Sequence, residues 1–553
     1  MDNQRTLLLV IAAFLVMMIW FRWEDAQRAA HPEAPESATT TTPSATGDAP
    51  AVPKAPVNAK PGASGTAPAV GAPEQAALER GKRVHVKTDL LDVEIDTLGG
   101  DVRYLGLRKL PRTLEDTSEP FPLMHDEGKT IYIAQSGLVG HGKNYPFHRT
   151  RFVADSSSYT LKDGEDKLVV DLHYRAPNGV RYTKRFSFSR NSYVVRTEFL
   201  VDNRSNKPWE GFLYGQFLRH PPESKSGFMA LPTFSGGAIY TKEDHYQKIK
   251  FSKMEEENLK RDVTGGWAAM MQHYFVGSWM PAAEQKGQIY TSNPASDRYV
   301  IGYKYTTPLV IAPGKTGSVG IDMFAGPKEH KRLKKLAEGM ELTVDFGWLT
   351  FIASPLFWLL TAIHGLIGNW GWSIIVLTIM IKAVFFPLNN AQYKSMAKMK
   401  KVGPRMKAMK EQYGDDRERY SKEMMELYKR EKINPMSGCL PIFIQIPVFI
   451  ALYWVLLESV EMRQAPFMLW IQDLSSQDPY YVLPILMGAS MFVTTWMSPT
   501  TDPMQRKMFL ALPLVFTVFF LFFPAGLVLY WFVNNVLQII QQTLINRSME
   551  RSK

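Results

Sequence analysis

Hydrophobic and polar positions divide the chain into regions of different pattern. Residues 6–22 form one unbroken apolar run, and residues from about 83 to about 325 alternate between apolar and polar positions. Five further apolar runs then follow, each close to the ~20 residues with which a helix crosses ~30 Å of hydrocarbon. These runs are 370–388, 440–458, 481–497, 508–523 and 526–545. The pattern predicts a multi-domain membrane protein, in which a strand-rich domain precedes a polytopic α-helical core.

The first apolar run is interpreted as a transmembrane anchor at residues 1–25. No small-x-small cleavage site follows within a few residues, because Trp23, Glu24 and Asp25 come next. The alanines at 29–30 keep a cleaved signal peptide open as the alternative. Residues 26–80 are dominated by Ala, Pro, Thr and Gly, and this composition cannot bury enough apolar surface to offset its ordering entropy. We expect a disordered periplasmic tether there.

Residues 81–327 have the pattern of an all-β domain. Turn signals such as Gly99-Gly100 interrupt the alternation. The clearest hairpin pairs 168–174 with 181–188 across a Pro-Asn-Gly turn, and a further strand follows at 193–201. Repeated short strands with few helical stretches predict a β-sandwich.

Residues 328–369 are predicted to be a linker that ends in an interfacial amphipathic helix. The stretch 346–366 is rich in aromatic and aliphatic residues, but it also contains several polar residues and Pro355. Such a helix is expected to lie in the membrane interface rather than to span the bilayer. The anchor and the five runs within 370–545 then give six transmembrane helices, and residues 546–553 form a short cytoplasmic tail.

The distribution of positive charge predicts how these helices are oriented. The chain has a net charge of +11 and a mean hydropathy of -0.16, so it is too polar to be membrane from end to end. Lysines and arginines gather in 390–435 and in the tail, whereas 459–480 holds only Arg463. Positive charge beside a span stays in the cytoplasm, so we expect cytoplasmic termini and a periplasmic β domain of an inner-membrane protein. The net positive charge is then explained by the phospholipid bilayer as a partner, and no specific nucleic acid partner is expected.

Lys382 is the sharpest candidate for function because it lies inside the run at 370–388. A charge within a span costs ~2.5–3.5 kcal/mol on insertion scales, so it normally faces protein or water. The alternative is snorkelling, since Lys382 is about six residues from the cytoplasmic end of the run and its stem could reach the headgroups.

Other polar residues are predicted at the depth of Lys382. Gln445 lies about one and a half turns into its run, and Asn535 lies near the middle of the last run. Thr378 is one turn from Lys382 on the same helix face. Together these residues predict a water-filled cavity or groove in the inner half of the bilayer. Each amide taken alone is also explained by a hydrogen bond that holds one helix to another, and this alternative stays open.

The basic segment 390–435 predicts a cytoplasmic helical hairpin with a methionine seam. Apolar residues recur at three and four positions on the first helix, the chain turns at 414–416, and Tyr420, Met424 and Leu427 continue the stripe. Methionine is adaptable and suits surfaces that accept many apolar partners, so transient contact with client proteins, meaning other proteins that bind here briefly, is expected. A solvated hairpin that only caps two spans is the alternative. The candidate contacts are Met396, Met399, Met406 and Met409.

Enzyme chemistry has no visible constellation in the sequence. The 11 histidines are scattered, and no His-Glu-x-x-His, Gly-x-Ser-x-Gly or Walker loop occurs. The single cysteine, Cys439, excludes an internal disulfide. We therefore predict no catalytic residue, no metal site and no cofactor.

Four long stretches carry a family resemblance. They are NWGWSIIVLTIMIKAVFFPLNNAQYKSMAKM, NPMSGCLPIFIQIPVFIALYWVL, RQAPFMLWIQDLSSQDPYYVLPILMG and FPAGLVLYWFVNN. These stretches, and the order of anchor, tether, β domain and core, resemble the YidC/Oxa family of Gram-negative bacteria across essentially the whole chain. The resemblance implies an insertase and chaperone for integral membrane proteins, not an enzyme, with a periplasmic supersandwich and a groove closed toward the periplasm. It also implies the Sec translocon and the ribosome as partners, and the short tail makes ribosome binding the weaker expectation.

Two positions differ from the family pattern. The family usually has arginine where this chain has Lys382, so the positive charge is kept but the bidentate fork is lost. The family's Leu-Tyr-Tyr pattern corresponds to Tyr530 followed by Trp531 here, which keeps a ring for contact with a client helix.

Two other classes of function fit the sequence less well. A secondary transporter predicts buried acidic partners and inverted repeats, and the runs show neither. A periplasmic carbohydrate-active enzyme with one membrane anchor would leave the five later apolar runs unexplained.

Overall fold

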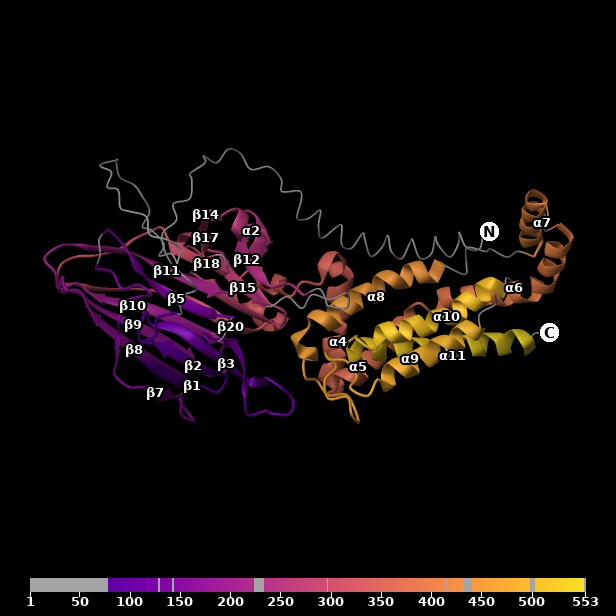
Figure 1. Ribbon diagram of the computed structural model, residues 1–553, viewed down its shortest axis with the longest axis horizontal. Helices are drawn as coiled ribbons and strands as arrows, with labels where there is room; N and C mark the ends of the chain where they lie inside the picture. The colour runs from indigo at the N-terminus through magenta and orange to yellow at the C-terminus, as the bar shows by residue number, and fades with distance from the viewer. Residues whose placement is uncertain are drawn as a thin grey trace. The chain divides into compact units, whose positions relative to one another are not determined.

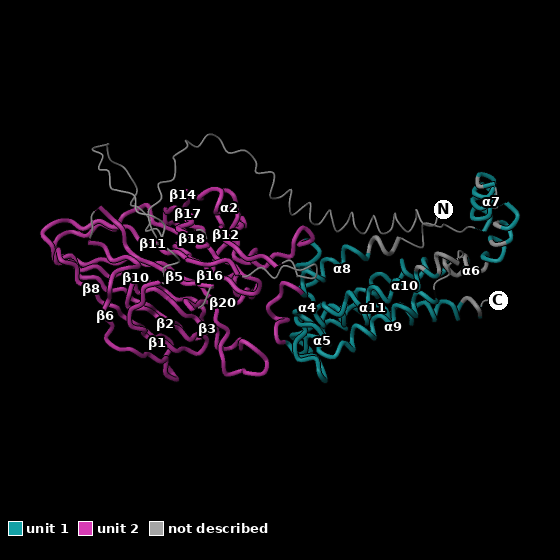
Figure 2. The backbone as a smooth tube through the Cα atoms, viewed as in Figure 1, with its two compact units in different colours: residues 1–46, 351–456, 465–553 teal, residues 47–350, 457–464 magenta. Residues whose placement is uncertain are grey.

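The structure is a computed structural model that describes residues 78–551, apart from 128–129, 142–143, 223–232, 296, 414–415, 432–439 and 498–502. The predicted anchor at 1–25 and nearly all of the predicted tether lie outside the described residues. The described chain divides into two compact units, which Figure 2 shows in different colours. The β unit comprises residues 78–350 and 457–464, and the helical unit comprises 351–456 and 465–551.

The β unit is built from two large sheets (Figure 1). The first sheet has the strand order β14-β17-β18-β11-β5-β3-β2-β1-β7, with β19 beside β11 and β4 beside β3. The second has the order β13-β12-β15-β16-β20-β10-β9-β8-β6. The prediction of a large β domain with two sheets is confirmed.

The chain passes between the two sheets several times. The strands of the first sheet are β1 (Arg83–Lys87), β2 (Leu91–Asp96), β3 (Asp101–Pro111), β4 (Pro120–Met124), β5 (Tyr132–Val139), β7 (Ser158–Thr160), β11 (Trp209–Arg219), β14 (Lys260–Thr264), β17 (Lys286–Ala295), β18 (Arg298–Tyr305) and β19 (Leu309–Ile311). Those of the second are β6 (Val153–Ala154), β8 (Lys167–Arg175), β9 (Arg181–Ser189), β10 (Val194–Asp202), β12 (Gly236–Thr241), β13 (His245–Ile249), β15 (Trp267–Gln272), β16 (Phe275–Met280) and β20 (Thr316–Pro327).

The local strand predictions agree with the structure. Strands β8 and β9 pair in antiparallel register from Lys167 opposite Ser189 to Arg175 opposite Arg181. Gly179 in the connecting turn has a φ of 89°, a left-handed conformation that glycine adopts without a Cβ penalty. The predicted strand at 193–201 is β10, which continues the same sheet beside β9.

The interior of the β unit contains large aromatic side chains and a lysine, Lys184, that joins the two sheets. Trp267 and Trp279 are 1% and 2% exposed. Lys184 on β9 is fully buried, and its Nζ donates to the carbonyl oxygens of Gly99 and Ser136 at 2.9 Å each. Because Ser136 belongs to β5, these hydrogen bonds cross from one sheet to the other.

A short segment far along the sequence is part of the β unit. Residues 457–464 follow the last apolar turn of a long helix, and they pack on the β strands. The Nζ of Lys328 lies 3.3 Å from a carboxylate oxygen of Glu458 and donates to the Thr343 carbonyl at 3.2 Å. The Nε2 of His273 lies 2.9 Å from the Leu457 carbonyl oxygen. These contacts hold the segment through a buried ion pair and a partly buried hydrogen bond.

Helices make up the rest of the described chain. Two short α-helices belong to the β unit, α2 (Phe251–Glu256) and α3 (His330–Leu336), with the 3-10 turns η1 (Met340–Thr343), η2 (Gly347–Leu349) and η4 (Val460–Met462). The helical unit contains α4 (Thr350–Ile367), α5 (Trp370–Val384), α6 (Phe386–Tyr413), α7 (Arg417–Arg430), α8 (Leu440–Glu458), α9 (Val482–Met497), α10 (Pro503–Phe520) and α11 (Ala525–Arg551). Helices α9, α10 and α11 run side by side (Figure 1), and α11 also packs against α5.

The predicted interfacial stretch forms α4, an 18-residue helix. One face of α4 is buried, with Ala353, Phe357 and Leu360, while Phe351 and Trp358 are 72% and 68% exposed. By length and composition, Gly347–Ile367 is apolar enough to cross a membrane. The interfacial placement of this helix stays a prediction.

The predicted run at 370–388 is bent rather than straight. Helix α5 ends at Val384, and α6 leaves it at an angle of 63°. Pro387 has no backbone N–H and cannot donate to the carbonyl four residues earlier, so the hydrogen-bond ladder is interrupted here. Gln445–Glu458, Val482–Met497 and Phe509–Phe520 are shorter apolar helices in the described chain, and the number of six spans stays a prediction.

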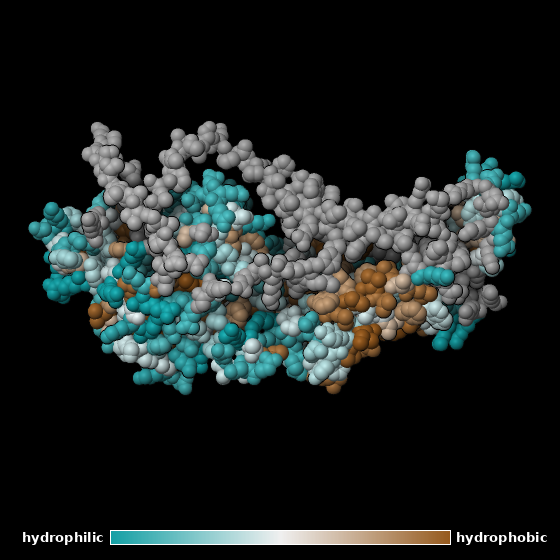
Figure 3. Space-filling view, viewed as in Figure 1, coloured by the Kyte–Doolittle hydropathy of each residue, from teal (hydrophilic) through white to brown (hydrophobic). Residues whose placement is uncertain are grey.

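Apolar side chains gather on the surface of the helical unit (Figure 3). On α10, Leu514, Val515 and Val518 are 71%, 64% and 53% exposed, and Trp496 on α9 is 63% exposed. Soluble proteins rarely expose contiguous apolar patches larger than a few hundred Å², so such a surface marks contact with lipid or protein.

Candidate functional site

Lys382 is buried in the helical unit. It lies in the last turn of α5, and its exposed fraction is 9%. Among the described residues, Lys382 has no hydrogen bond and no carboxylate within ion-pair distance. Thr378, one turn earlier, is 1% exposed, and its hydroxyl donates to the Ile374 carbonyl at 2.6 Å. Lys382 and Thr378, which were predicted to share one face of the helix, are both buried. The Thr378 hydroxyl donates within its own helix and not toward Lys382.

Two amide hydrogen bonds join the helices around α11. The Nδ2 of Asn535 donates to the Ser490 hydroxyl on α9 at 3.1 Å, and the Nε2 of Gln445 on α8 donates to Asn534 at 2.7 Å. Each bond links one helix to another, which is the alternative role that the sequence analysis left open for these amides. Lys382 takes no part in these two hydrogen bonds. Contacts with the described residues therefore explain the positions of the Gln445 and Asn535 amides but not the burial of Lys382.

The two aromatic candidates pack against a ring on α8. Phe449 stacks on Tyr530 with ring centroids 6.1 Å apart and meets Trp531 edge-on at 4.4 Å. Trp531 also lies 5.4 Å from the Phe520 ring on α10. Tyr530 is 1% exposed, whereas Trp531 keeps part of its surface accessible. Of the two, Trp531 is therefore placed better for contact with another molecule.

The predicted hairpin is formed by α6 and α7. Asp416 caps α7, since its Oδ1 accepts a hydrogen bond from the Arg419 N–H at 3.0 Å. Val402, Met406 and Leu427 form a buried cluster between the two helices, with Met409 and Met424 packed against it. The methionine seam predicted from the sequence is confirmed for these residues, and Met406 contributes to the hairpin's own core. The side chains of Met396 and Met399 lie outside the described part.

Two polar residues of the helical unit were not predicted from the sequence. They are Ser490 and Thr494 on α9, which are both 7% exposed. Ser490 and Thr494 are four residues apart, and this spacing places both on one helix face. That spacing was the available signal, although small hydroxyl residues are common in apolar helices.

The described residues give no indication of a metal site. No group of three or more His, Cys, Asp or Glu side chains that could hold a metal ion occurs among them. The polar candidates around Lys382 are amides and hydroxyls, which together with its ammonium suit hydrogen bonding and charge attraction.

Comparison with protein families gives two matches that cover most of the chain. The model of the YidC periplasmic domain matches residues 83–359. The model of the 60Kd inner membrane protein matches residues 362–552. The first match covers the strand-rich part. The second covers the helices from α5 to α11, and Lys382 lies on α5.

Curated relatives match the chain over its full length. A membrane protein insertase YidC from Stutzerimonas stutzeri is 47% identical over 570 residues, covering 100% of this chain and 99% of the relative. One from Methylobacillus flagellatus is 47% identical over 555 residues, covering 100% and 98%. A solved structure, described as an active YidC insertase with the first transmembrane domain resolved, is 18% identical. It covers 84% of this chain and 92% of that one, with a TM-score of 0.40.

Proposed function

This chain belongs to the YidC family of membrane protein insertases, and we propose that it inserts its clients through a hydrophilic groove in the inner leaflet that contains Lys382. The clients are integral membrane proteins, which the chain helps to insert and fold. The family is named for insertion and not for a catalysed reaction. The observation that carries the proposal is a lysine that is 9% exposed and has no carboxylate partner among the described residues.

Desolvation of polar groups is the main barrier to insertion. Moving a polar segment from water into hydrocarbon costs several kcal/mol for each unsatisfied group, and more for a charge. A groove that admits water reduces this cost, because the polar segment keeps hydrogen-bond partners while it crosses part of the bilayer. No nucleotide is required for this step.

Lys382 supplies the attraction for acidic client segments. Its ammonium attracts a carboxylate without the planar fork of an arginine. Gln445 and Asn535 offer amides, and Thr378 lines the same face of α5. The client's apolar helix moves along Trp531 into the lipid, and contact with Tyr530, which is 1% exposed, requires the surrounding helices to move. The membrane potential assists a negative charge outward by ~2.3 kcal/mol per 100 mV.

The proposed topology follows from the charge distribution. Six transmembrane helices, including the anchor at 1–25, place both termini in the cytoplasm of an inner-membrane protein with a periplasmic β domain. The hairpin of α6 and α7 then lies in the cytoplasm, where Met396, Met399, Met406 and Met409 receive clients. Because Met406 is buried in the hairpin, its contact with a client requires the two helices to separate.

The Sec translocon and the ribosome are the proposed partners. Either can deliver a client to the helical unit, and the chain also acts without them on small clients.

Complementation of a bacterium depleted of its own YidC tests the role of Lys382. The wild-type chain and Lys382→Arg are expected to support growth and insertion of a two-span client with an acidic segment. Lys382→Ala and Lys382→Glu are expected to lower insertion at least about tenfold, which corresponds to about 1.4 kcal/mol.

Lys429→Ala is the matched control, because it removes a lysine from the exposed surface of α7. Immunoblots must show equal amounts of every variant. Equal insertion by all Lys382 variants would assign Lys382 to snorkelling and remove it from the mechanism. Failure of the wild-type chain to rescue growth would contradict the proposal as a whole.

A further inference from the structure

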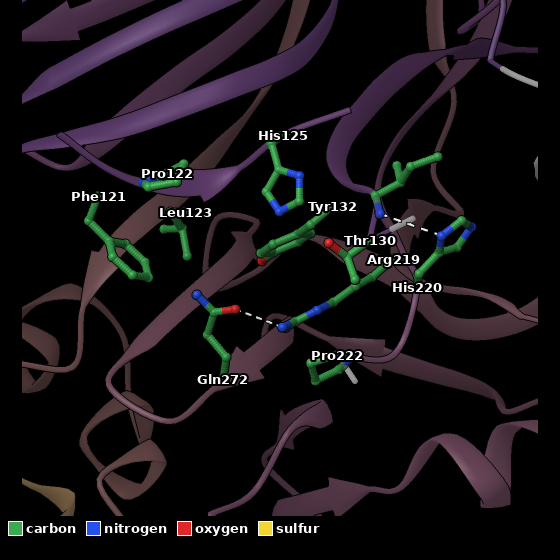
Figure 4. A pocket seen from close by; sticks show the side chains of 11 residues that line it. Phe121, Pro122, Leu123, His125, Thr130, Tyr132, Arg219, His220, Pro222 and Gln272 are labelled. Atoms are coloured by element: carbon green, nitrogen blue, oxygen red, sulfur yellow. Dashed lines mark hydrogen bonds between the residues drawn. The ribbon is translucent and has the colours of Figure 1, made fainter. Parts of the chain in front are cut away.

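The β unit contains a pocket that is separate from the residues proposed for the groove. Its volume is about 520 Å³, within the range of ~300–1,000 Å³ that is typical of small-molecule sites. The pocket lies where β4, the start of β5, the end of β11 and the end of β15 meet (Figure 4). Residues that line it include Phe121, Leu123, Thr130, Tyr132, Arg219 and Gln272.

Arg219 is a buried cation in the wall of this pocket. Its exposed fraction is 5%, and its guanidinium lies 4.8 Å from the centre of the Tyr132 ring. Nη1 donates to the Met271 carbonyl at 3.0 Å and Nη2 donates to the Gln272 Oε1 at 2.6 Å, as Figure 4 shows for Gln272. Both acceptors are neutral, and no carboxylate among the described residues lies within ion-pair distance of Arg219.

The hydrogen-bonding capacity of Arg219 exceeds what its neighbours use. A guanidinium has five N–H donors, and these two contacts occupy two of them. A buried charge is normally paired, because its desolvation is costly. A guanidinium that lies in a pocket wall and has no carboxylate partner among the described residues therefore favours an anionic ligand with a planar carboxylate.

The other walls indicate what the rest of the ligand looks like. Phe121 stacks on Phe275 with ring centroids 4.3 Å apart, and Leu123 is buried next to it in β4. Among the described residues that line the pocket, Arg219 is the only one with a permanently charged side chain, so the site suits one negative charge rather than a phosphate dianion. Burial lowers the pKa of His125, and the Arg219 cation adds to this, so the His125 imidazole is neutral near pH 7.

We propose that this pocket binds the carboxylate of a ligand with an apolar or aromatic body. The carboxylate pairs with Arg219, and the body packs against Phe121 and Leu123. Two sources present this chemistry, a free organic acid and an acidic side chain beside an aromatic residue in a peptide. The proposal is independent of insertion through the helical unit, so the failure of one leaves the other standing.

Titration calorimetry on the full chain in a non-ionic detergent tests this inference. Phenylacetate represents the free acid, and the blocked peptide acetyl-Phe-Glu-Phe-amide represents the acidic side chain. Phenylacetamide and the peptide with Gln in place of Glu are the uncharged twins. At least one carboxylate probe is expected to bind at least tenfold more tightly than its twin. Binding of the peptide alone supports the carboxylate site and assigns its source to a polypeptide.

Two variants link the binding to the pocket. Arg219→Gln removes the charge and is expected to weaken binding at least tenfold. Thr130→Trp fills the pocket and leaves both hydrogen bonds of Arg219 in place, and it is also expected to weaken binding. This variant tests the proposal even if Arg219→Gln fails to fold. Arg204→Gln, at an arginine whose side chain is 55% exposed, is the control that should bind as the wild type does.

Three results would overturn the proposal. The first is that neither carboxylate probe binds, and the second is that acid and amide bind equally. The third is that binding persists both in Thr130→Trp and in a folded Arg219→Gln protein. A melting curve for each variant shows whether the chain is folded.

Discussion

Buried lysines in the two units differ in their partners. In the β unit, Lys184 and Lys328 are 0% and 2% exposed, and each ammonium donates to carbonyl oxygens. Lys328 also faces the Glu458 carboxylate at 3.3 Å. In the helical unit, Lys382 is 9% exposed, and the described residues give it neither kind of partner. A buried charge with satisfied hydrogen bonds is explained by the fold itself, whereas one without them points to water or a client.

The largest expected effect is the loss of the ion pair between Lys328 and Glu458. Lys328→Met leaves Glu458 buried without its ammonium, which should lower the free energy of unfolding of the β unit by about 3–5 kcal/mol. Calorimetry of the full chain in detergent should then show a melting temperature lower by roughly 6 °C or more.

An exposed ion pair of the same unit provides the control. Arg196 and Asp322 lie 3.1 Å apart with side chains 50% and 40% exposed, so Arg196→Met should change the free energy of unfolding by less than about 1 kcal/mol. The double variant Lys328→Met/Glu458→Gln should recover part of the loss, because no unpaired carboxylate remains. Equal effects of Lys328→Met and Arg196→Met would contradict the structural role of the buried pair.

The second prediction concerns His273, which lies beside Lys328. Burial, together with the Lys328 cation, lowers the pKa of His273 to about 4 from an ordinary value of 6.5. The unfolded chain therefore binds more protons than the folded chain between pH 6.5 and pH 4. Stability from the neutral imidazole is complete above pH 6.5 and is lost as the pH falls toward 4, by about 1–3 kcal/mol.

His273→Gln separates this effect from other titrations. A glutamine amide can still donate to the Leu457 carbonyl but does not titrate, so the variant should lose less stability than the wild type between pH 6.5 and pH 4. His85→Gln is the control, because the His85 side chain is 57% exposed. Parallel stability curves for wild type and His273→Gln would show that the imidazole does not contribute.

The sequence predicted the elements of the β unit better than the contacts between them. Hairpin β8–β9 follows from alternation and from a Pro-Asn-Gly turn, both of which are local. The same alternation places Lys184 on the inward face with Tyr182 and Phe186, so its burial was readable from the sequence. Its acceptors come from Gly99 and Ser136, which are distant in sequence, and no local pattern identifies them.

The segment 457–464 shows the same limit more strongly. In the sequence it begins a loop between two apolar runs, and its composition does not indicate a partner. Its place in the β unit depends on Lys328, His273 and the Pro111 carbonyl, which accepts a hydrogen bond from Arg463 at 2.8 Å. These partners lie more than a hundred residues away, and such contacts form only when the tertiary structure does.

The polar residues of the candidate site could be identified from the sequence, but the hydrogen bonds between them could not. Gln445 and Asn535 stand out as polar residues within apolar runs, and their common depth stays a prediction. Their partners Asn534 and Ser490 depend on the rotation of three helices about their axes, which hydrophobic patterns on short apolar helices define poorly. Lys382 was the easiest to identify, because a single charge stands out in an apolar run.

The smallest expected effect on stability is that of Lys382→Met. Since Lys382 has no partner among the described residues, its removal leaves no carboxylate unpaired, and methionine keeps a similar length without a buried charge. The free energy of unfolding should change by less than about 1 kcal/mol, or increase, while insertion of an acidic client falls. Calorimetry and the insertion assay on the same preparation would check both. A loss of more than about 2 kcal/mol, as expected for Lys328→Met, would mean that Lys382 has a structural partner in the folded chain and that its charge is retained for stability rather than for clients.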